Sequence, residues 1–160
     1  MPTLTHNLDP SSAKTEDDYH RLLIRWFQFG VFTPIFRVHG AGTHTEIWNF
    51  GNQTSSVINR SAITLRYRLL PYVYSGFWRV EMTGYTMQRA LAFDHSADAG
   101  VRDVADAYMF GPSLLVTPIV SAGDTGTATT REVNFPQGAW VDFHTGQDRL
   151  RVRRNGRWEY

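Results

Sequence analysis

The chain of 160 residues contains no cysteine. Disulfide bonds and thiolate metal sites are therefore excluded, and cysteine usage does not indicate a redox compartment. Two of the histidines, His39 and His44, flank glycines but have no third ligand nearby, so we expect neither a metal site nor another cofactor. No apolar run could span a bilayer, and the first residues lack the apolar segment of a secretory signal. We expect no membrane partner, and the localisation stays open.

The net charge is only +1, but the charged residues are distributed unevenly along the chain. Residues 1–148 carry eleven basic and fourteen acidic groups, whereas residues 149–160 carry five arginines and one glutamate. A basic end can be a nucleic-acid or membrane arm, or a solvated tail foreign to the domain. Nucleic-acid binding needs a basic face with interleaved aromatics, and this body is acidic. We therefore expect a solvated tail over residues 148–160 and no nucleic-acid partner.

What the chain does contain is 14% aromatic residues, many of them in an amphipathic helix that leads into a strand over residues 19–40. Asp17 and Asp18 suit the positive end of a helix, and Gly30 suits its left-handed cap. The helix is predicted from apolar residues at helical spacing, namely Tyr19, Leu22, Leu23, Trp26 and Phe27.

From residue 31 to residue 38 the apolar period changes to two, which predicts a buried strand. One predicted face is apolar and packs under helices: Phe32, Pro34, Phe36 and Val38. The other predicted face points toward a ligand pocket inside a barrel and becomes more polar toward the carboxyl end of the strand: Thr33, Ile35, Arg37 and His39. In a barrel of alternating strands and helices, substrate contacts lie at the carboxyl ends of the strands. Arg37 and His39 are therefore candidate binding residues.

Residues 41–53 read as a polar loop that holds Trp48 and Phe50, which either packing or a ligand must cover. Residues 56–82 are predicted to form a long helix that is capped by Ser56, kinked or broken near Pro71, ended by Gly84 and buried between layers. Its apolar positions are Ile58, Ala62, Leu65, Leu69, Val73, Phe77, Trp78 and Val80.

After residue 84 the pattern changes to short strands, which suggests a boundary between a barrel end and a β-rich module. We expect a strand over residues 85–93, an acidic surface connection over 94–107, and an apolar segment over 108–120. Strands over residues 132–135 and 139–143 are predicted to form a hairpin around Pro136-Gln137-Gly138.

Several motifs, taken in this order, resemble glycoside hydrolase family 31, in particular its α-xylosidase and α-glucosidase branches. They are residues 25–30 (Arg-Trp-Phe-Gln-Phe-Gly), 36–40 (Phe-Arg-Val-His-Gly), 46–48 (Glu-Ile-Trp), 65–72, 84–89, 109–116 and 140–146. The resemblance covers residues 19–147. The amino-acid sequences of the first and third motifs resemble those of the α-xylosidases more than those of the α-glucosidases.

The resemblance implies an α/β fold: the C-terminal fragment of a (β/α)8 TIM barrel, followed by part of an antiparallel β-sandwich domain. Residues 1–18 would be a polar lead-in, 19–84 the barrel end, 85–147 the start of the β-rich domain and 148–160 a divergent tail. The family retains anomeric configuration through two Asp residues about 5 Å apart. Both belong to earlier barrel strands, so no catalytic residue is assigned here, and we expect this fragment alone to be inactive.

The same resemblance implies that His39 hydrogen-bonds a sugar hydroxyl beside the cleaved bond, since imidazole both donates and accepts. A His that merely caps loop carbonyls is the alternative. Arg37 would pair with an active-site carboxylate or simply hold the strand end. Trp48 is a candidate sugar platform, whereas Trp26 is expected in the core and residues 66–68 at an exposed helix edge.

The expected partner is therefore an α-linked oligosaccharide or xyloside, and full-length members of the family can oligomerise. The sequence predicts a retaining α-xylosidase-like or α-glucosidase-like glycosidase fragment. A noncatalytic carbohydrate-binding or structural fragment is the alternative, and it requires His39 and Trp48 to be exposed together.

Overall fold

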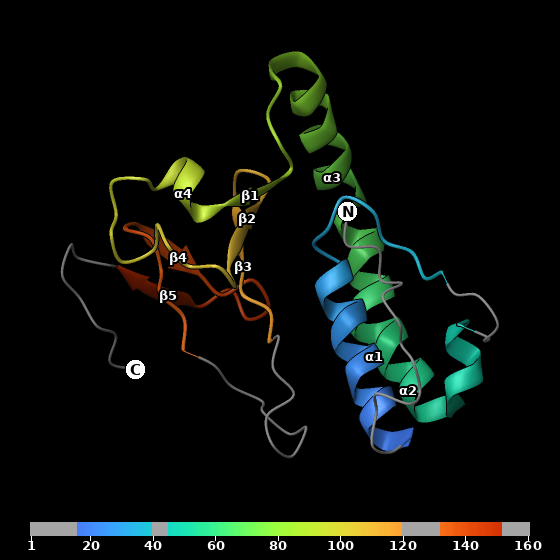
Figure 1. The fold of residues 1–160 in the computed structure, drawn as a ribbon. Helices are drawn as coiled ribbons and strands as arrows, with labels where there is room; N and C mark the ends of the chain where they lie inside the picture. The colour runs from blue at the N-terminus through green and yellow to red at the C-terminus, as the bar shows by residue number, and fades with distance from the viewer. Residues whose placement is uncertain (1–15, 40–44, 120–131, 152–160) are drawn as a thin grey trace.

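A helical part and a β-rich part lie side by side in the computed structural model, which describes residues 16–39, 45–119 and 132–151 (Figure 1). The helical part comprises α1 (Glu16–Gly30), η1 (Ile47–Phe50), α2 (Gly51–Ile58), the π-helical η2 (Asn59–Ile63) and α3 (Thr64–Thr83). The β-rich part comprises β1 (Gln88–Ala90), α4 (Leu91–Asp94), β2 (Tyr108–Phe110), β3 (Leu114–Val116), β4 (Ala139–Val141) and β5 (Asp148–Arg151).

The first helix has the predicted extent and the predicted buried face. Leu23 and Phe27 of α1 are almost fully buried, and α1 ends at Gly30. The Val31 amide donates to the Phe27 carbonyl at 3.2 Å, so the chain leaves the helix through one further turn. Trp26, expected in the core, is only half-buried: it packs edge-to-face on Phe29 and does not belong to the core cluster of the described residues.

Residues 31–38 do not form the predicted strand. A strand requires a neighbour to complete its hydrogen-bond ladder, and the described residues supply none for this segment. The period of two nevertheless persists at its end: Phe36 and Val38 are half-buried against the core, while Ile35, Arg37 and His39 are exposed. The alternation is thus set by burial of one side rather than by pairing.

Two residues of this segment lie on the opposite side from the one predicted. Thr33 was predicted to share the face of Arg37 and His39, but it is buried instead. Its Oγ1 lies 2.8 Å from the Gly30 carbonyl oxygen and 2.7 Å from the Ile35 carbonyl oxygen. Pro34 is exposed rather than packed. Because residues 31–34 still turn away from the helix end, the extended alternation begins only after them.

The long helix differs from the prediction at its start and in its middle. Helical structure begins at Ile47, so residues 47–53 are not loop and Ser56 lies inside α2 instead of capping a helix. Pro71 does not break α3, which runs from Thr64 to Thr83 and ends at left-handed Gly84. Buried residues on both sides of Pro71, such as Leu69 and Val73, hold the helix in place.

The β-rich part is built from two small antiparallel sheets. One has the strand order β1-β2-β3, and the other pairs β4 with β5. The predicted strand over residues 85–93 is shorter than expected because Leu91, fully buried, begins α4. The predicted hairpin around residues 136–138 is also wrong, since residues 132–135 form no strand and β4 pairs instead with β5 beyond the turn at residues 142–147.

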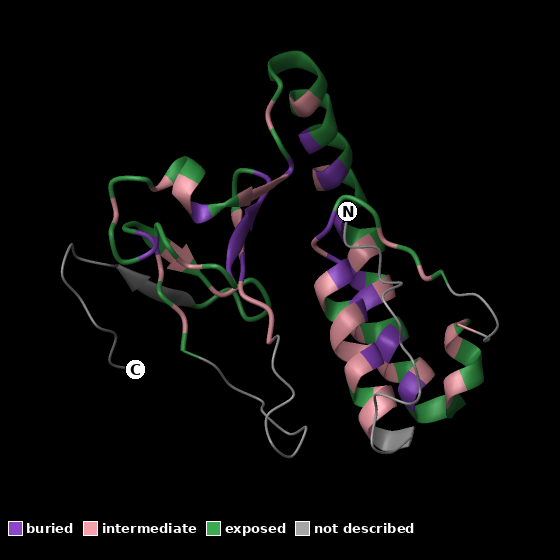
Figure 2. Cartoon of the chain, in the orientation of Figure 1, coloured by how far each residue is buried: buried purple, intermediate pink, exposed green. Residues whose placement is uncertain are grey.

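One apolar core joins the helical part to β2 and β3. The Tyr72 hydroxyl of α3 donates to the Phe110 carbonyl at 2.8 Å and accepts from the Ser113 amide at 3.1 Å. The Tyr108 hydroxyl of β2 donates to the Phe32 carbonyl at 3.0 Å, and burial raises the pKa of Tyr108, so this donor stays protonated well into the alkaline range. Buried residues therefore line both sides of the junction (Figure 2).

The tight turn between β2 and β3 yields a prediction about Gly111. Its φ of 62° is left-handed, and an added Cβ would overlap the Tyr72 hydroxyl. We expect Gly111→Ala to lower the free energy of unfolding by about 1 kcal/mol from its backbone conformation and by about 2 kcal/mol more from the overlap. Urea unfolding followed by circular dichroism measures the loss.

Gly146 provides the matched control, because its φ is 70° and a Cβ there would meet no atom within 4 Å. Gly146→Ala should therefore lose only the backbone contribution of about 1 kcal/mol. Equal losses in the two variants would show that Tyr72 does not clamp the turn.

Candidate functional site

The candidate site is the exposed side of residues 35–39. Arg37 and His39 point away from the core because Phe36 and Val38 alternate with them and pack inward. Phe36 is held edge-to-face on Phe27 of α1, with ring centroids 5.8 Å apart. The polar side chains therefore have fixed backbone positions although they make no core contact themselves.

Trp48 lies apart in η1, with 74% of its surface exposed. The helical turn is closed by a hydrogen bond from Asn49 Nδ2 to Glu46 Oε2 at 2.8 Å. Its neighbour Phe50 is instead covered by packing between Tyr19 and His20, at centroid distances of 5.7 and 5.8 Å. Of the two aromatics predicted in this segment, only Trp48 is left available for a ligand.

The structure brings these three predicted residues to the surface of the helical part without linking them to one another. Within the described segments, no hydrogen bond, ion pair or ring contact joins Arg37, His39 and Trp48. The intervening residues 40–44, which include His44, lie outside the described residues. An incoming ligand or another part of a barrel would have to bridge the three side chains.

Arg66 is the residue that fixes this site, and the sequence placed it wrongly at an exposed helix edge. Its guanidinium donates to the carbonyl oxygens of Val31 at 2.7 Å, Thr33 at 2.6 Å and Pro34 at 3.1 Å. It also lies 5.8 Å from the centre of the Phe36 ring. Burial lowers the pKa of Arg66, but a guanidinium stays charged throughout the physiological range.

A signal for Arg66 was present in the helical spacing. It follows Ala62 by four residues and precedes Leu69 by three, so it lies at the margin of the buried face of α3. A planar fork of five donors at that margin can satisfy several carbonyls that have no ladder partner. Tyr67 and Arg68, the rest of the predicted edge, are exposed as expected.

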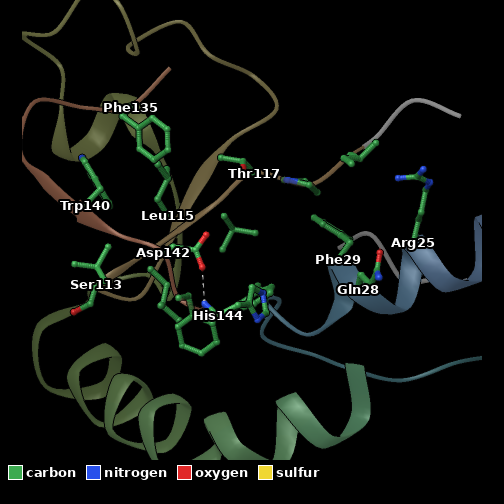
Figure 3. A pocket seen from close by; sticks show the side chains of 17 residues that line it. Arg25, Gln28, Phe29, Ser113, Leu115, Thr117, Phe135, Trp140, Asp142 and His144 are labelled. Carbon is green, nitrogen blue, oxygen red and sulfur yellow. Dashed lines mark hydrogen bonds between the residues drawn. The ribbon is translucent and has the colours of Figure 1, made fainter. Parts of the chain in front are cut away.

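A separate cavity of about 790 Å³ lies between α1 and the β-rich part (Figure 3). Arg25 and Phe29 of α1 line one side, and Trp140 and His144 line the other. The Asp142 carboxylate at its edge is engaged locally, since Oδ1 accepts from the His144 amide at 3.0 Å and from the Thr145 amide at 2.8 Å. None of the predicted binding residues lines this cavity.

The described residues contain no group of three or more His, Asp or Glu side chains that could hold a metal ion. They also contain no helix whose length and apolar character would allow it to cross a membrane.

Comparison with known proteins agrees with a division into a helical part and a following β-rich part. Residues 11–76 match the model of the glycosyl hydrolases family 31 TIM-barrel domain, and residues 84–160 match that of the family 31 C-terminal domain. The chain belongs to glycosyl hydrolase family 31. The C-terminal model extends through the segment predicted as a divergent tail, whose first residues form β5.

Among family 31 relatives, an alpha-xylosidase of Saccharolobus solfataricus is 40% identical over 81% of this chain. Alpha-glucosidase 2 of Bacillus thermoamyloliquefaciens is 38% identical over 79% of it. A solved α-xylosidase from a soil metagenome, complexed with xylose, superposes with a TM-score of 0.76 and 34% identity over 85% of the chain.

The chain is much shorter than the family 31 proteins that it matches. It spans 17% of the Saccharolobus α-xylosidase, 16% of the Bacillus α-glucosidase and 22% of the metagenomic enzyme chain. The predicted TIM-barrel fragment and following domain are thus confirmed at the level of the family.

The role of Arg66 can be tested by replacing it with methionine, which keeps much of the aliphatic stem. We expect Arg66→Met to lower the free energy of unfolding by about 2 kcal/mol, because three carbonyls lose a charged donor. The backbone amides of residues 31–33, 35 and 36 should also exchange faster with deuterium, because the segment is held less firmly. The control is Arg68→Met, at an exposed position on the same helix, which should change neither quantity. Equal effects of both substitutions would contradict the carbonyl-binding role.

Proposed function

We propose that this chain forms part of a retaining α-glycosidase of the α-xylosidase or α-glucosidase type, and that it supplies one edge of the sugar-binding site. The observation that carries the proposal is the alternation over residues 35–39. It exposes Arg37 and His39 on the side away from the apolar core, at the end of a segment that matches the family's TIM barrel. The carboxyl end of a barrel strand is where such enzymes bind their substrates.

His39 is the central residue of the proposed site. A neutral imidazole can donate one hydrogen bond and accept another, so it can distinguish the orientation of a sugar hydroxyl. Its exposure leaves the ring free to reach a sugar. Arg37, on the same side of the segment, would pair with a carboxylate from a neighbouring strand.

Trp48 would provide an apolar surface for the sugar ring. Its indole is largely exposed, although Ile47 and Phe50 of η1 are partly buried and pack against the core. Exposure of a large aromatic side chain on a fixed turn favours contact with a ligand or with another part of the protein.

The two catalytic carboxylates are proposed to come from barrel strands outside these 160 residues. Retention requires two carboxyl groups about 5 Å apart on opposite sides of the glycosidic bond. Aspartates within the described chain have other partners: Asp94 pairs with Arg89 at 3.0 Å, and Asp98 accepts from the Gly100 amide. These engagements support the proposal that the two catalytic carboxylates lie outside these residues.

An α-xyloside is the substrate that we favour. The alpha-xylosidase relative is 40% identical, and the solved relative bound to xylose is an α-xylosidase. We further infer that residues 19–84 close a (β/α)8 barrel and that residues 85–147 begin an antiparallel β-sandwich, for which the two small antiparallel sheets are the support.

A noncatalytic carbohydrate-binding fragment is the second candidate. The joint exposure of His39 and Trp48 supports it, because sugar binding needs a hydrogen-bonding group and an aromatic face but no carboxylate pair.

The chain on its own should not turn over an aryl α-xyloside, because the proposal places the pair of catalytic carboxyl groups outside these 160 residues. Release of the phenol, followed by absorbance, measures turnover. Activity of the isolated chain that disappears in His39→Ala would contradict the proposal that the catalytic groups lie elsewhere.

In a chimera, this chain replaces the matching segment of the Saccharolobus α-xylosidase. There we expect His39→Ala to lower kcat/KM for the aryl α-xyloside by about a hundredfold, the effect of losing a substrate contact worth about 3 kcal/mol in the transition state. His144→Ala, which alters an exposed histidine in the β4–β5 turn, is the control and should leave kcat/KM unchanged. A His39→Ala chimera as active as the parent would refute the substrate-binding role.

A further inference from the structure

The four consecutive backbone carbonyls of residues 31–34 are bound by side chains from two distant parts of the chain. The first, third and fourth of these carbonyls accept hydrogen bonds from the guanidinium of Arg66 in α3. The second, that of Phe32, accepts from the hydroxyl of Tyr108 in β2 at 3.0 Å. The backbone that leads into the candidate site is therefore held by the helical part and by the β-rich part at once.

The position of Tyr108 is itself well fixed. β2 is the middle strand of its sheet, and Tyr108 pairs with Ala90 of β1 on one side and with Val116 of β3 on the other. The tyrosine ring is buried and packs edge-to-face on Phe29 of α1, with centroids 6.0 Å apart. The hydroxyl is thus a donor whose place is set by the sheet and by α1.

The Phe32 carbonyl depends on this donor because Phe32 is half-buried at the junction. A carbonyl that is shielded from water and has no donor costs about as much free energy as a lost hydrogen bond. The Phe32 carbonyl and the Thr33 amide belong to one planar peptide group. A rotation of this group toward another donor would therefore displace the neighbouring carbonyls that Arg66 binds.

The same backbone continues into residues 35–39, which carry the candidate site. The half-buried Phe36 and Val38 pack against the core and leave the side chain of His39 exposed. Its direction therefore depends on the backbone that precedes it. Hydrogen bonds and packed side chains that form one continuous network can carry a displacement from one part of a protein to another. A shift of residues 31–34 would thus reach His39.

We propose that Tyr108 is a positioning residue of the sugar-binding edge, through which the β-rich part holds the backbone that directs His39 toward the substrate. The inference rests on the proposed function, because it assigns the β-rich part a role in binding the α-xyloside. Tyr108 would act on the site through one hydrogen bond and without touching the sugar.

The first measurement is NMR spectroscopy of the full chain of 160 residues. Tyr108→Phe removes the hydroxyl and keeps the ring that packs on Phe29, so we expect the variant to fold like the wild type. The backbone amide resonances of Thr33 and of residues 35–39 should shift. The Thr33 resonance reports the lost hydrogen bond itself, and the resonances of residues 35–39 report whether its effect reaches the site.

Tyr72→Phe is the matched control, because it removes another tyrosine hydroxyl at the same junction. This hydroxyl binds the Phe110 carbonyl and the Ser113 amide. The substitution should therefore shift the amide resonances of Gly111 and Ser113 and leave those of residues 35–39 in place. Equal shifts of residues 35–39 in both tyrosine variants would overturn the proposal, as would a shift of Thr33 alone in Tyr108→Phe.

The second measurement is a double-mutant cycle in the chimera with the Saccharolobus α-xylosidase. We expect Tyr108→Phe to lower kcat/KM for the aryl α-xyloside by about tenfold, because a small displacement of a substrate contact is costly. In the His39→Ala background the same substitution should cost less than about twofold, because the residue through which it acts is absent. Tyr72→Phe should leave kcat/KM unchanged in both backgrounds.

A substitution that merely destabilises the chimera would lower kcat/KM equally with and without His39, and that result overturns the positioning role. The two measurements also separate this inference from the proposed function. If His39→Ala alone leaves kcat/KM unchanged, the substrate-binding role of His39 fails, and the resonances of residues 35–39 still decide whether Tyr108 holds the segment. If His39→Ala lowers kcat/KM and those resonances do not move in Tyr108→Phe, only the positioning role is overturned.

Discussion

The guanidinium of Arg66 is the interaction on which the arrangement of the helical part depends. Residues 31–34 have backbone carbonyls but no neighbouring strand in the described chain, and three of these carbonyls accept from Arg66. Buried or half-buried carbonyls without donors would cost free energy comparable to lost hydrogen bonds. One side chain of α3 therefore does locally what a strand ladder does in a complete barrel, and it directs residues 35–39 toward the surface.

The junction with the β-rich part is built on the same principle, with side-chain hydroxyls binding backbone groups. Tyr72 bridges Phe110 and Ser113, and Tyr108 reaches back to Phe32. The Phe32 and Phe110 rings pack edge-to-face beside these bonds, at a centroid distance of 6.2 Å. Because the polar tips are satisfied and the rings are buried, one core extends across both parts of the chain.

Local patterns predicted the buried face of α1 and the alternation over residues 35–39, but in α3 Phe77 and Trp78 are exposed instead of buried. The spacing of Leu23 and Phe27 predicted α1, and the alternation over residues 35–39 predicted which side chains share a face. Patterns failed where a tertiary contact overrides a local signal. Pro71 does not break α3, and Leu91 begins a helix inside a predicted strand because its side chain fills the second apolar cluster. Gly138 suggested a hairpin turn, but β4 finds its partner on the other side.

By itself, the sequence determined the family, the two-part organisation and the candidate residues Arg37, His39 and Trp48, because motifs and periodicities are local and survive without the rest of a barrel. Only the tertiary structure decided that Arg66 binds backbone carbonyls, that Phe50 is covered while Trp48 is not, and that several apolar side chains of α3 are exposed. These facts depend on which distant surfaces meet, and spacing along one helix cannot specify what packs against each of its faces.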